Sequence, residues 1–261
     1  MKRVAALYDI HGNLPALDAV LRDVRAERVD AVVIGGDVLP GPMPNECLQR
    51  LLELDVPTHS VHGNGDLAIL AQLEGSRSGT VSYWGTTSGA RPPDSVVAAF
   101  QWCAGALHPD YESVIAAWPR TLELEVEGVG RVLFSHSTPR SETEGFTKLT
   151  PDERLRPIFE PLDANLFVGG HTHMQFDRAV SSKRVVNAGS VGMPFGDPGA
   201  YWLLLGPEVQ LRRTSYDLEA AAAAIRSTEY PGADAFATGN VLNPPSEETM
   251  LKAFAAFELS P

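Results

Sequence analysis

Short runs of apolar residues recur along the chain, and each is followed within a few positions by a polar side chain that can bind a metal ion. Val4 to Leu7 leads to Asp9 and His11, and Ala31 to Ile34 leads through two glycines to Asp37. Continuous apolar runs of this length are typical of strands that are buried on both faces of a sheet. The pattern therefore predicts buried strands with candidate ligands at their carboxyl ends.

The same arrangement returns in the middle of the chain. Val132 to Phe134 precedes His136, and Leu166 to Val168 precedes His171 and His173. Strand ends that carry polar side chains in this repeated way indicate a shared site rather than four unrelated loops.

The segment between the first two strands predicts a helix. Its apolar residues repeat at helical spacing behind Asn13, a good N-cap residue. A second helix over 44–54 and a weaker strand over 58–62, which stops just before Asn64, complete a βαβαβ pattern. This pattern favours a parallel sheet with right-handed crossovers, in which sites form at the carboxyl ends of the strands.

Residues 75–93 are rich in Gly, Ser, Thr and Pro, and we interpret them as a long loop or lid inserted into the domain. Tyr83 and Trp84 in this segment could stack on a substrate base or anchor the loop on the core. Both roles fit an aromatic pair in a loop.

The rest of the chain predicts further helices and a second sheet. Helices are expected over 95–106 and 109–118, and alternating strands over 121–126, 131–136, 183–186 and 201–205. These strands predict a second, more antiparallel sheet. Packing helices are expected at about 217–258, so residues 1–261 are interpreted as one domain.

The charge of the chain argues against two classes of partner. The 261 residues include 21 Lys plus Arg and 33 Asp plus Glu, a net charge of −12, which argues against a stable nucleic-acid complex or binding to an anionic membrane.

The apolar runs are shorter than the roughly 18–20 residues of a membrane span. The first residues leave no room for a signal peptide, so a cytoplasmic protein is expected. Cys47 and Cys103 form no disulfide framework, and Cys47 is expected to be a buried thiol.

The candidate ligands together define a chemistry. They are two carboxylates, one amide oxygen and four imidazoles: Asp9, His11, Asp37, Asn64, His136, His171 and His173. This mixed set suits Mn, Fe, Zn, Ni or Co, and it is too large for one ion. Two ions about 3.5–4 Å apart that share a carboxylate, for which Asp37 is the natural bridge, would use all seven. Such a pair lowers the pKa of its water and binds phosphoryl oxygens, which suits phosphoester hydrolysis.

These motifs, in this order, resemble those of the calcineurin-like metallophosphoesterase superfamily. The opening Asp9-Ile10-His11-Gly12-Asn13-Leu14-Pro15-Ala16-Leu17, together with Asn187-Ala188-Gly189-Ser190-Val191-Gly192 and Gly196-Asp197-Pro198, is similar to the small bacterial phosphodiesterase branch. The resemblance implies an α/β fold, a four-layer α/β/β/α sandwich, with a dinuclear metal site at the edge of the sheets.

The resemblance also implies how the ligands are divided. One ion would be held by Asp9, His11, Asp37 and His173, and the other by Asp37, Asn64, His136 and His171. It further implies two divalent ions, of which Mn is favoured, and in-line attack of a metal-bridging hydroxide on phosphorus. Asp37 and His136 would then act in catalysis through the metals.

The chain departs from the superfamily pattern at one important position. Many members have a general-acid His where this chain has Gly65, so no general acid is identified. His62 could substitute as the acid, or could be a structural residue at a strand end. Because a missing acid matters least for good leaving groups, we expect a preference for phosphodiesters, phosphoanhydrides or activated monoesters.

Substrate contacts are less well defined. The phosphate-binding arginines of the protein-phosphatase branch are absent, which disfavours a Ser/Thr protein phosphatase. Arg140 could bind the substrate phosphate through its planar guanidinium, or could be an exposed loop charge. Asn187 and Ser190 are interpreted as a turn that hydrogen-bonds a His ligand, and Asp66 as a supporting residue or helix cap.

Two functions remain open from the sequence. The first is a dinuclear metal-dependent phosphoesterase that hydrolyses a small phosphodiester or nucleotide-type substrate. The second is a metal-dependent nucleotide-binding or regulatory module in which Gly65 reflects weak or lost catalysis. Both predict a small phosphorylated partner, and both leave a homo-oligomer open.

Overall fold

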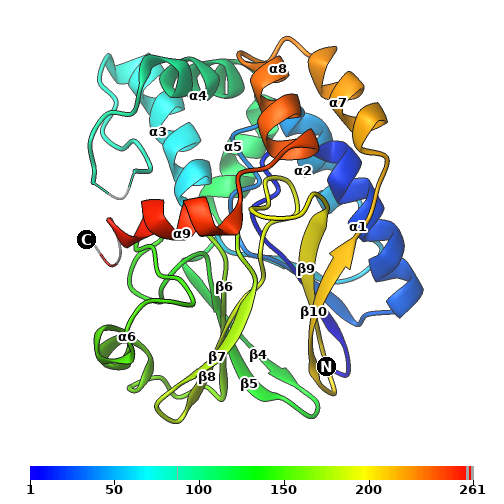
Figure 1. Cartoon of the computed structure of the whole chain (residues 1–261). Coiled ribbons are helices and arrows are strands. Elements are labelled where there is room, and N and C mark those ends of the chain that lie inside the picture. The colour runs from blue at the N-terminus through cyan, green and yellow to red at the C-terminus, as the bar shows by residue number, and fades with distance from the viewer. Residues whose placement is uncertain (87, 257–258, 260–261) are drawn as a thin grey trace.

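Two five-stranded sheets pack face to face in the computed structural model, which describes residues 1–86, 88–256 and 259 (Figure 1). The apolar layer between the sheets joins side chains from both, among them Tyr8 and Leu203 from one sheet and Phe134 and Val168 from the other. The two sheets therefore share one buried apolar layer.

The first sheet has the strand order β10-β9-β1-β2-β3. Its strands are β1 (Val4–Leu7), β2 (Ala31–Ile34), β3 (Thr58–Ser60), β9 (Ala200–Leu205) and β10 (Val209–Thr214). The first three strands are parallel, which confirms the predicted βαβαβ unit, and β9 joins β1 in the antiparallel direction.

The second sheet has the order β4-β5-β6-β8-β7. Its strands are β4 (Thr121–Val126), β5 (Gly130–Ser135), β6 (Leu166–Gly169), β7 (Phe176–Val180) and β8 (Lys183–Asn187). The central β5, β6 and β8 are parallel, whereas β4 and β7 are antiparallel edges. The prediction that 201–205 belongs to this sheet is wrong, because β9 pairs with β1 instead. Alternation along a strand does not specify which sheet it joins.

Helices cover the outer face of each sheet and give four layers, α/β/β/α. The first sheet is covered by α1 (Leu14–Glu27), α2 (Pro44–Leu52), α3 (Asn64–Ser78), α4 (Asp94–Ala106) and α5 (Pro109–Ala116). On the second sheet, α6 (Asp152–Phe159) packs through Leu155 and Phe159 against Phe167 and Val185. The fold class implied by the resemblance is therefore confirmed.

Local sequence accounts for the helix ends that position the site. The Asn13 side chain accepts a 3.2 Å hydrogen bond from the Ala16 N–H and so begins α1 directly after β1. At the other end of the site region, α3 runs on to Ser78 and ends at Gly79, which has a left-handed φ of 81°. The described residues without helix or strand are thus 79–86 and 88–93, whereas the expected segment was 75–93.

The C-terminal part adds a group of helices that pack on one another and a helix that crosses one face. It comprises α7 (Leu218–Arg226), α8 (Ala233–Phe236), a π-helical segment (Ala237–Leu242) and α9 (Glu247–Ala255). The first three pack on one another around Ile225 and Phe236. Helix α9, drawn in red in Figure 1, crosses one face of the molecule. The last two residues of the expected helical region, 257 and 258, lie outside the described residues. Along the described chain, no helix has both the length and the apolar character needed to cross a bilayer.

Candidate metal centre

The carboxyl ends of four strands bring the predicted ligands to one edge of the paired sheets. Asp9 follows β1, Asp37 follows β2, and His136 follows β5, while His171 and His173 come after β6. The Asn64 side chain joins them from the first residue of α3. The carboxylates and the imidazole of His136 are at most 3% exposed. The strands therefore bring candidate ligands that lie between Asp9 and His173 in the sequence into one buried cluster.

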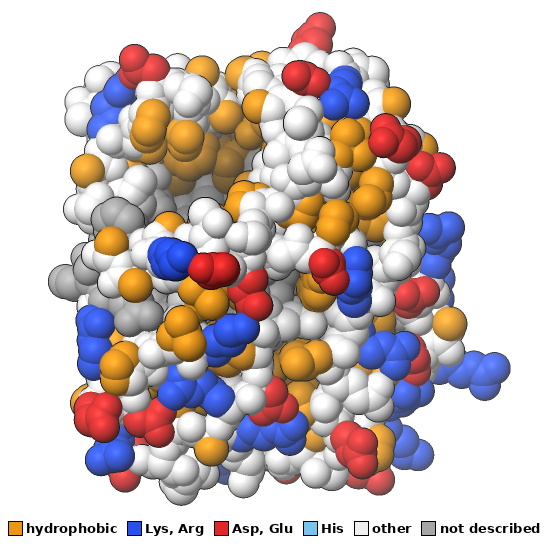
Figure 2. Space-filling view, viewed as in Figure 1, with side chains coloured by type: hydrophobic (Ala, Val, Ile, Leu, Met, Phe, Trp, Pro, Cys, Tyr) orange, Lys and Arg blue, Asp and Glu red, His pale blue; other side chains and the backbone are white. Residues whose placement is uncertain are grey.

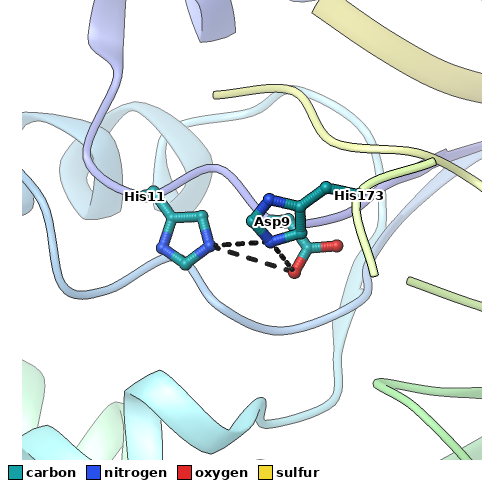
Figure 3. A group of neighbouring side chains, drawn as sticks. All are labelled: Asp9, His11 and His173. Atoms are coloured by element: carbon teal, nitrogen blue, oxygen red, sulfur yellow. Dashed lines mark hydrogen bonds and ion pairs between the residues drawn. The ribbon is translucent and has the colours of Figure 1, made fainter. Parts of the chain in front are cut away.

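One group of ligand atoms is formed by Asp9, His11 and His173 (Figure 3). The Nε2 atoms of the two histidines lie 3.2 Å apart. Oδ1 of Asp9 lies 3.2 Å from Nε2 of His173 and 4.0 Å from Nε2 of His11. Three donor atoms that converge in this way fit one face of a metal coordination shell.

A second group is formed by Asp9, Asp37 and His136. Nε2 of His136 lies 3.5 Å from Oδ2 of Asp37 and 2.8 Å from Oδ1 of Asn64. The same Asp37 oxygen lies 3.7 Å from Nε2 of His11 in the first group. Asp37 Oδ2 thus faces both groups, which is the position that a bridging carboxylate needs.

Two buried polar atoms of the cluster have no hydrogen-bond partner among the described residues: Asp9 Oδ1 and His171 Nε2. The His171 ring packs edge-on against His136, with ring centroids 5.2 Å apart. Orphaned buried acceptors are costly, and a bound cation would satisfy both. The donor set and these two atoms fit divalent metal ions.

Backbone carbonyl groups orient three of the imidazoles. The Nδ1 atoms lie 2.9 Å from the Gly35 carbonyl oxygen for His136 and 2.7 Å from that of Met193 for His173. For His11 the partner is the Pro40 carbonyl at 3.3 Å. A histidine that donates from Nδ1 presents the lone pair of Nε2, so these contacts direct Nε2 towards the cluster.

The turn after β3 holds Asp37 in place. The backbone N–H of Gly65 donates a 2.7 Å hydrogen bond to Asp37 Oδ1, which leaves Oδ2 for the cluster. Gly63 is required here, because a Cβ at this position would lie 2.1 Å from Asp37 Oδ1. Close backbone approach is the physical reason for this glycine.

Position 65 has no room for a side chain. A Cβ at Gly65 would lie 2.3 Å from the Leu39 carbonyl oxygen and 3.0 Å from Asp37 Oδ1. The general-acid histidine that many superfamily members carry at this place therefore cannot be accommodated by the local backbone of this chain.

Backbone strain is concentrated on the candidate ligands. Among the described residues, eight that are not glycine have positive φ, and five of them belong to the cluster: Asp9, His11, Asp37, His171 and His173, with φ between 48° and 66°. A left-handed conformation costs an L-residue roughly 1–2 kcal/mol. Such outliers persist where the surrounding fold enforces them, and they gather at functional sites.

The electrostatics of the cluster favour a cation. Burial, and then the negative charge of Asp9, raise the pKa of Asp37 well above its ordinary value. Burial opposes ionisation of Asp9 as well, but the His173 and His136 imidazoles lower its pKa. Burial lowers the pKa of His11 and His171 to about 3, so both imidazoles are uncharged at neutral pH and available as ligands.

A family model for the calcineurin-like phosphoesterase superfamily domain matches residues 2–206, a span that includes all seven candidate ligands. The chain belongs to this superfamily. An uncharacterized protein of Methanocaldococcus jannaschii is 26% identical over 248 residues, which cover 87% of this chain and 93% of that protein.

Two solved structures share the fold of this chain. A hypothetical protein from Pyrococcus horikoshii has a TM-score of 0.76 at 18% identity and covers 94% of this chain and 100% of its own, which shows a shared fold. A metallophosphoesterase from Sphaerobacter thermophilus has a TM-score of 0.67 at 25% identity, with 92% of this chain and 100% of that chain covered.

Arg140 and Tyr83, two other residues singled out in the sequence, are bound to carboxylates rather than placed in the ligand cluster. Arg140 is paired with the buried Glu144, with its Nε 2.8 Å from both carboxylate oxygens. The Tyr83 hydroxyl donates a 3.0 Å hydrogen bond to Glu142, and the ring packs against the core, as an anchor would. His62 is half-buried, and its Nδ1 has no hydrogen-bond partner among the described residues. Burial lowers the pKa of His62.

The turn after β8 supports the centre in a different way from the one expected. Asn187 donates to the Gly170 carbonyl at 2.7 Å and so shapes the turn that carries His171. The Ser190 hydroxyl donates to the backbone carbonyl of Asp9 at 2.7 Å, rather than to a histidine.

Phe195 is a neighbour of the centre that sequence reasoning missed. Its ring stacks on His173, with centroids 5.0 Å apart and an interplanar angle of 23°. An isolated Phe in a loop carries no periodic signal, so only its place beside the Gly196-Asp197-Pro198 motif pointed to this segment.

Proposed function

We propose that this chain is a dinuclear metal-dependent phosphoesterase that hydrolyses small phosphodiesters or nucleotide-type substrates. The observation that carries the proposal is the convergence of imidazole nitrogens on two buried carboxylates, with Asp9 Oδ1 and His171 Nε2 left without a hydrogen-bond partner among the described residues. Membership of the superfamily supports it independently.

The ligand chemistry supports the assignment of the ions. Asp9, His11, Asp37 and His173 would hold one ion, and Asp37, Asn64, His136 and His171 the other. When bound, such a pair activates a water molecule and neutralises charge on the phosphoryl oxygens. Mn²⁺ is proposed as the metal because the set mixes imidazole nitrogen with carboxylate and amide oxygen.

The protein's own groups set up this arrangement. The backbone carbonyls of Gly35, Pro40 and Met193 hold the imidazoles, and the Gly65 N–H holds Asp37. The packing around Gly65 excludes a histidine acid at that position. A preference for diesters and for esters with good leaving groups follows, since these need little protonation of the leaving oxygen.

Turnover of bis(p-nitrophenyl) phosphate by the purified, Mn²⁺-loaded protein tests the proposal. We expect turnover that exceeds that of p-nitrophenyl phosphate and is abolished in Asp37→Asn. No turnover of any ester with any of Mn²⁺, Fe²⁺, Zn²⁺, Ni²⁺ and Co²⁺ would refute it.

A second candidate is favoured by the closed position 65 alone. In that case the chain would be a metal-dependent nucleotide-binding or regulatory module. It predicts that nucleotides bind to the metal-loaded protein without product formation, which calorimetry and product analysis distinguish from catalysis.

A further inference from the structure

Helix α9 lies across one face of the molecule (Figure 1). Glu247, Met250, Leu251 and Phe254 recur at helical spacing and are half-buried, whereas no described residue of α9 is fully buried. The helix therefore rests on the molecule through one face. Figure 2 shows a hollow beside it whose visible walls are largely hydrophobic side chains.

Contacts near the start of α9 fix its position. Lys148 Nζ lies 2.8 Å from Glu247 Oε1, and the Gly196 N–H donates a 2.9 Å hydrogen bond to the Pro245 carbonyl. Gly196 directly follows Phe195, the residue stacked on His173. The helix and the loop beside the metal ligand are thus joined.

Three rings lead from the metal ligand to α9. The His173 and Phe195 rings are 5.0 Å apart, and the Phe195 and Phe254 rings are 6.3 Å apart with an interplanar angle of 50°. A Cβ at Gly145 would lie 3.5 Å from the Phe254 ring and 3.9 Å from Thr172 Cγ2. Phe254 therefore lies close to the turn that carries His171 and His173. Both phenylalanines are only partly buried, so part of each side chain is open to solvent.

Two arginines, Arg140 and Arg120, are already paired and therefore offer less to a substrate. Arg140, four residues beyond His136, has its Nη2 2.7 Å from Glu144. Arg120, which donates to the Arg140 carbonyl, lies 3.7 Å from Glu142. Because both arginine side chains already have carboxylate partners, a second anionic group of the substrate would gain little by binding to them. A planar group of the substrate could instead contact the two aromatic side chains, Phe195 and Phe254.

We propose that Phe195 and Phe254 form an aromatic wall of the substrate site and select phosphoesters that carry a planar aromatic group, such as a nucleobase or an aryl ester. The inference rests on the proposed function, because the metals must place the phosphoryl group beside His173. Stacking of a planar group on an aromatic side chain is strong enough to set a preference of about tenfold or more.

Calorimetric binding of two phosphonates to the Mn²⁺-loaded protein tests the wall without turnover. We expect phenylphosphonate to bind about tenfold more tightly than methylphosphonate. Phe254→Leu keeps an apolar anchor for α9 but removes the planar ring, so it should lose most of that preference while binding methylphosphonate as before. Phe254→Tyr should keep the preference. Lys252→Ala, on the exposed side of α9, is the matched control and should behave as wild type.

Phe195→Leu provides a second, independent variant, because it leaves the contacts of Pro245 and Glu247 in place. It should lose the preference as Phe254→Leu does. A wild-type protein that binds the two phosphonates equally, or binds neither, would overturn the inference, as would leucine variants that retain the preference. Hydrolysis of bis(p-nitrophenyl) phosphate is scored separately, so a protein that turns over without the preference loses this inference and keeps the proposed function.

Discussion

The carboxylate of Asp66 accepts a 2.8 Å hydrogen bond from the backbone N–H of Asp37. The same side chain accepts hydrogen bonds from the N–H groups of Gly63, at 2.9 Å, and Leu39, at 3.0 Å. Asp66 is fully buried, and burial together with the Asp37 charge raises its pKa to about 7. One carboxylate therefore ties together the turns after β2 and β3, which present Asp37 and Asn64.

Loss of the Asp66 hydrogen bonds should weaken metal binding, although Asp66 is not itself a candidate ligand. In Asp66→Ala, three buried N–H groups lose their acceptor, and each orphaned group costs about 1–3 kcal/mol. We expect Mn²⁺ affinity to fall about 10- to 100-fold, as is typical for residues that orient ligands. Titration calorimetry measures the affinity, and urea unfolding measures the stability. Asp66→Asn, which keeps one acceptor oxygen, should lose less; equal losses in both variants would contradict the role assigned to the hydrogen bonds.

Metal should stabilise the fold strongly, because it relieves repulsion between two buried carboxylates. At free Mn²⁺ of 100 times the dissociation constant, linkage gives a gain of about 2.7 kcal/mol. Differential scanning calorimetry before and after treatment with a chelator should show a clear fall in Tm on metal removal. Asp37→Asn serves as the comparison, and its Tm should respond much less to Mn²⁺. An unchanged wild-type Tm across the metal titration would argue against the centre.

Position 65 should resist any side chain. Because a Cβ would lie 2.3 Å from the Leu39 carbonyl oxygen, Gly65→Ala should destabilise the protein by about 1–3 kcal/mol. Gly65→His should likewise fail to create phosphomonoesterase activity. Gly105→Ala in α4 is the control, since a Cβ there meets nothing within 4 Å, and it should stabilise by about 0.5–1 kcal/mol. A Gly65→Ala protein as stable as wild type would show that the turn can move.

The Tyr83 hydroxyl should matter for anchoring the 79–93 segment. Glu142, whose side chain is 12% exposed, accepts its hydrogen bond at 3.0 Å. Tyr83→Phe keeps the ring in the core but removes this bond, at a cost of about 1 kcal/mol. Hydrogen exchange measured by mass spectrometry should then be faster in 80–93 and unchanged in α1. If exchange in the segment stays at the wild-type rate, the ring alone anchors it.

Most of the candidate ligands could be predicted because they follow a continuous apolar strand, and the strand order then places them together. Asp9 and Asp37 lie at equivalent ends of paired parallel strands, so local pattern and topology point the same way. The sequence indicates that Asp66 is a supporting residue or a helix cap, but it does not indicate which backbone groups Asp66 binds. Hydrogen bonds that join two turns 29 positions apart depend on packing, which local pattern does not encode.

Three features of the structure could not be predicted from the sequence: the pairing of β9, the end of α3 and the contact between Phe195 and His173. The sequence pattern does not predict that β9 pairs with β1, because side chains on both faces of β9 are buried and the pattern does not identify the neighbouring strand. The low helix propensity of Gly75, Ser76 and Ser78 predicts a loop from residue 75, but tertiary packing overrides it and α3 continues to Ser78. The stack of Phe195 on His173 is a contact between loops and leaves no periodic trace.

The central claim is a two-metal centre bridged by Asp37, and the number of Mn²⁺ ions bound per chain at saturation tests it most directly. Elemental analysis of the Mn²⁺-saturated protein, after removal of free metal, should give two ions per chain for wild type and at most one for Asp37→Asn. A wild-type protein that retains no ion, or a variant that retains two, would contradict the account.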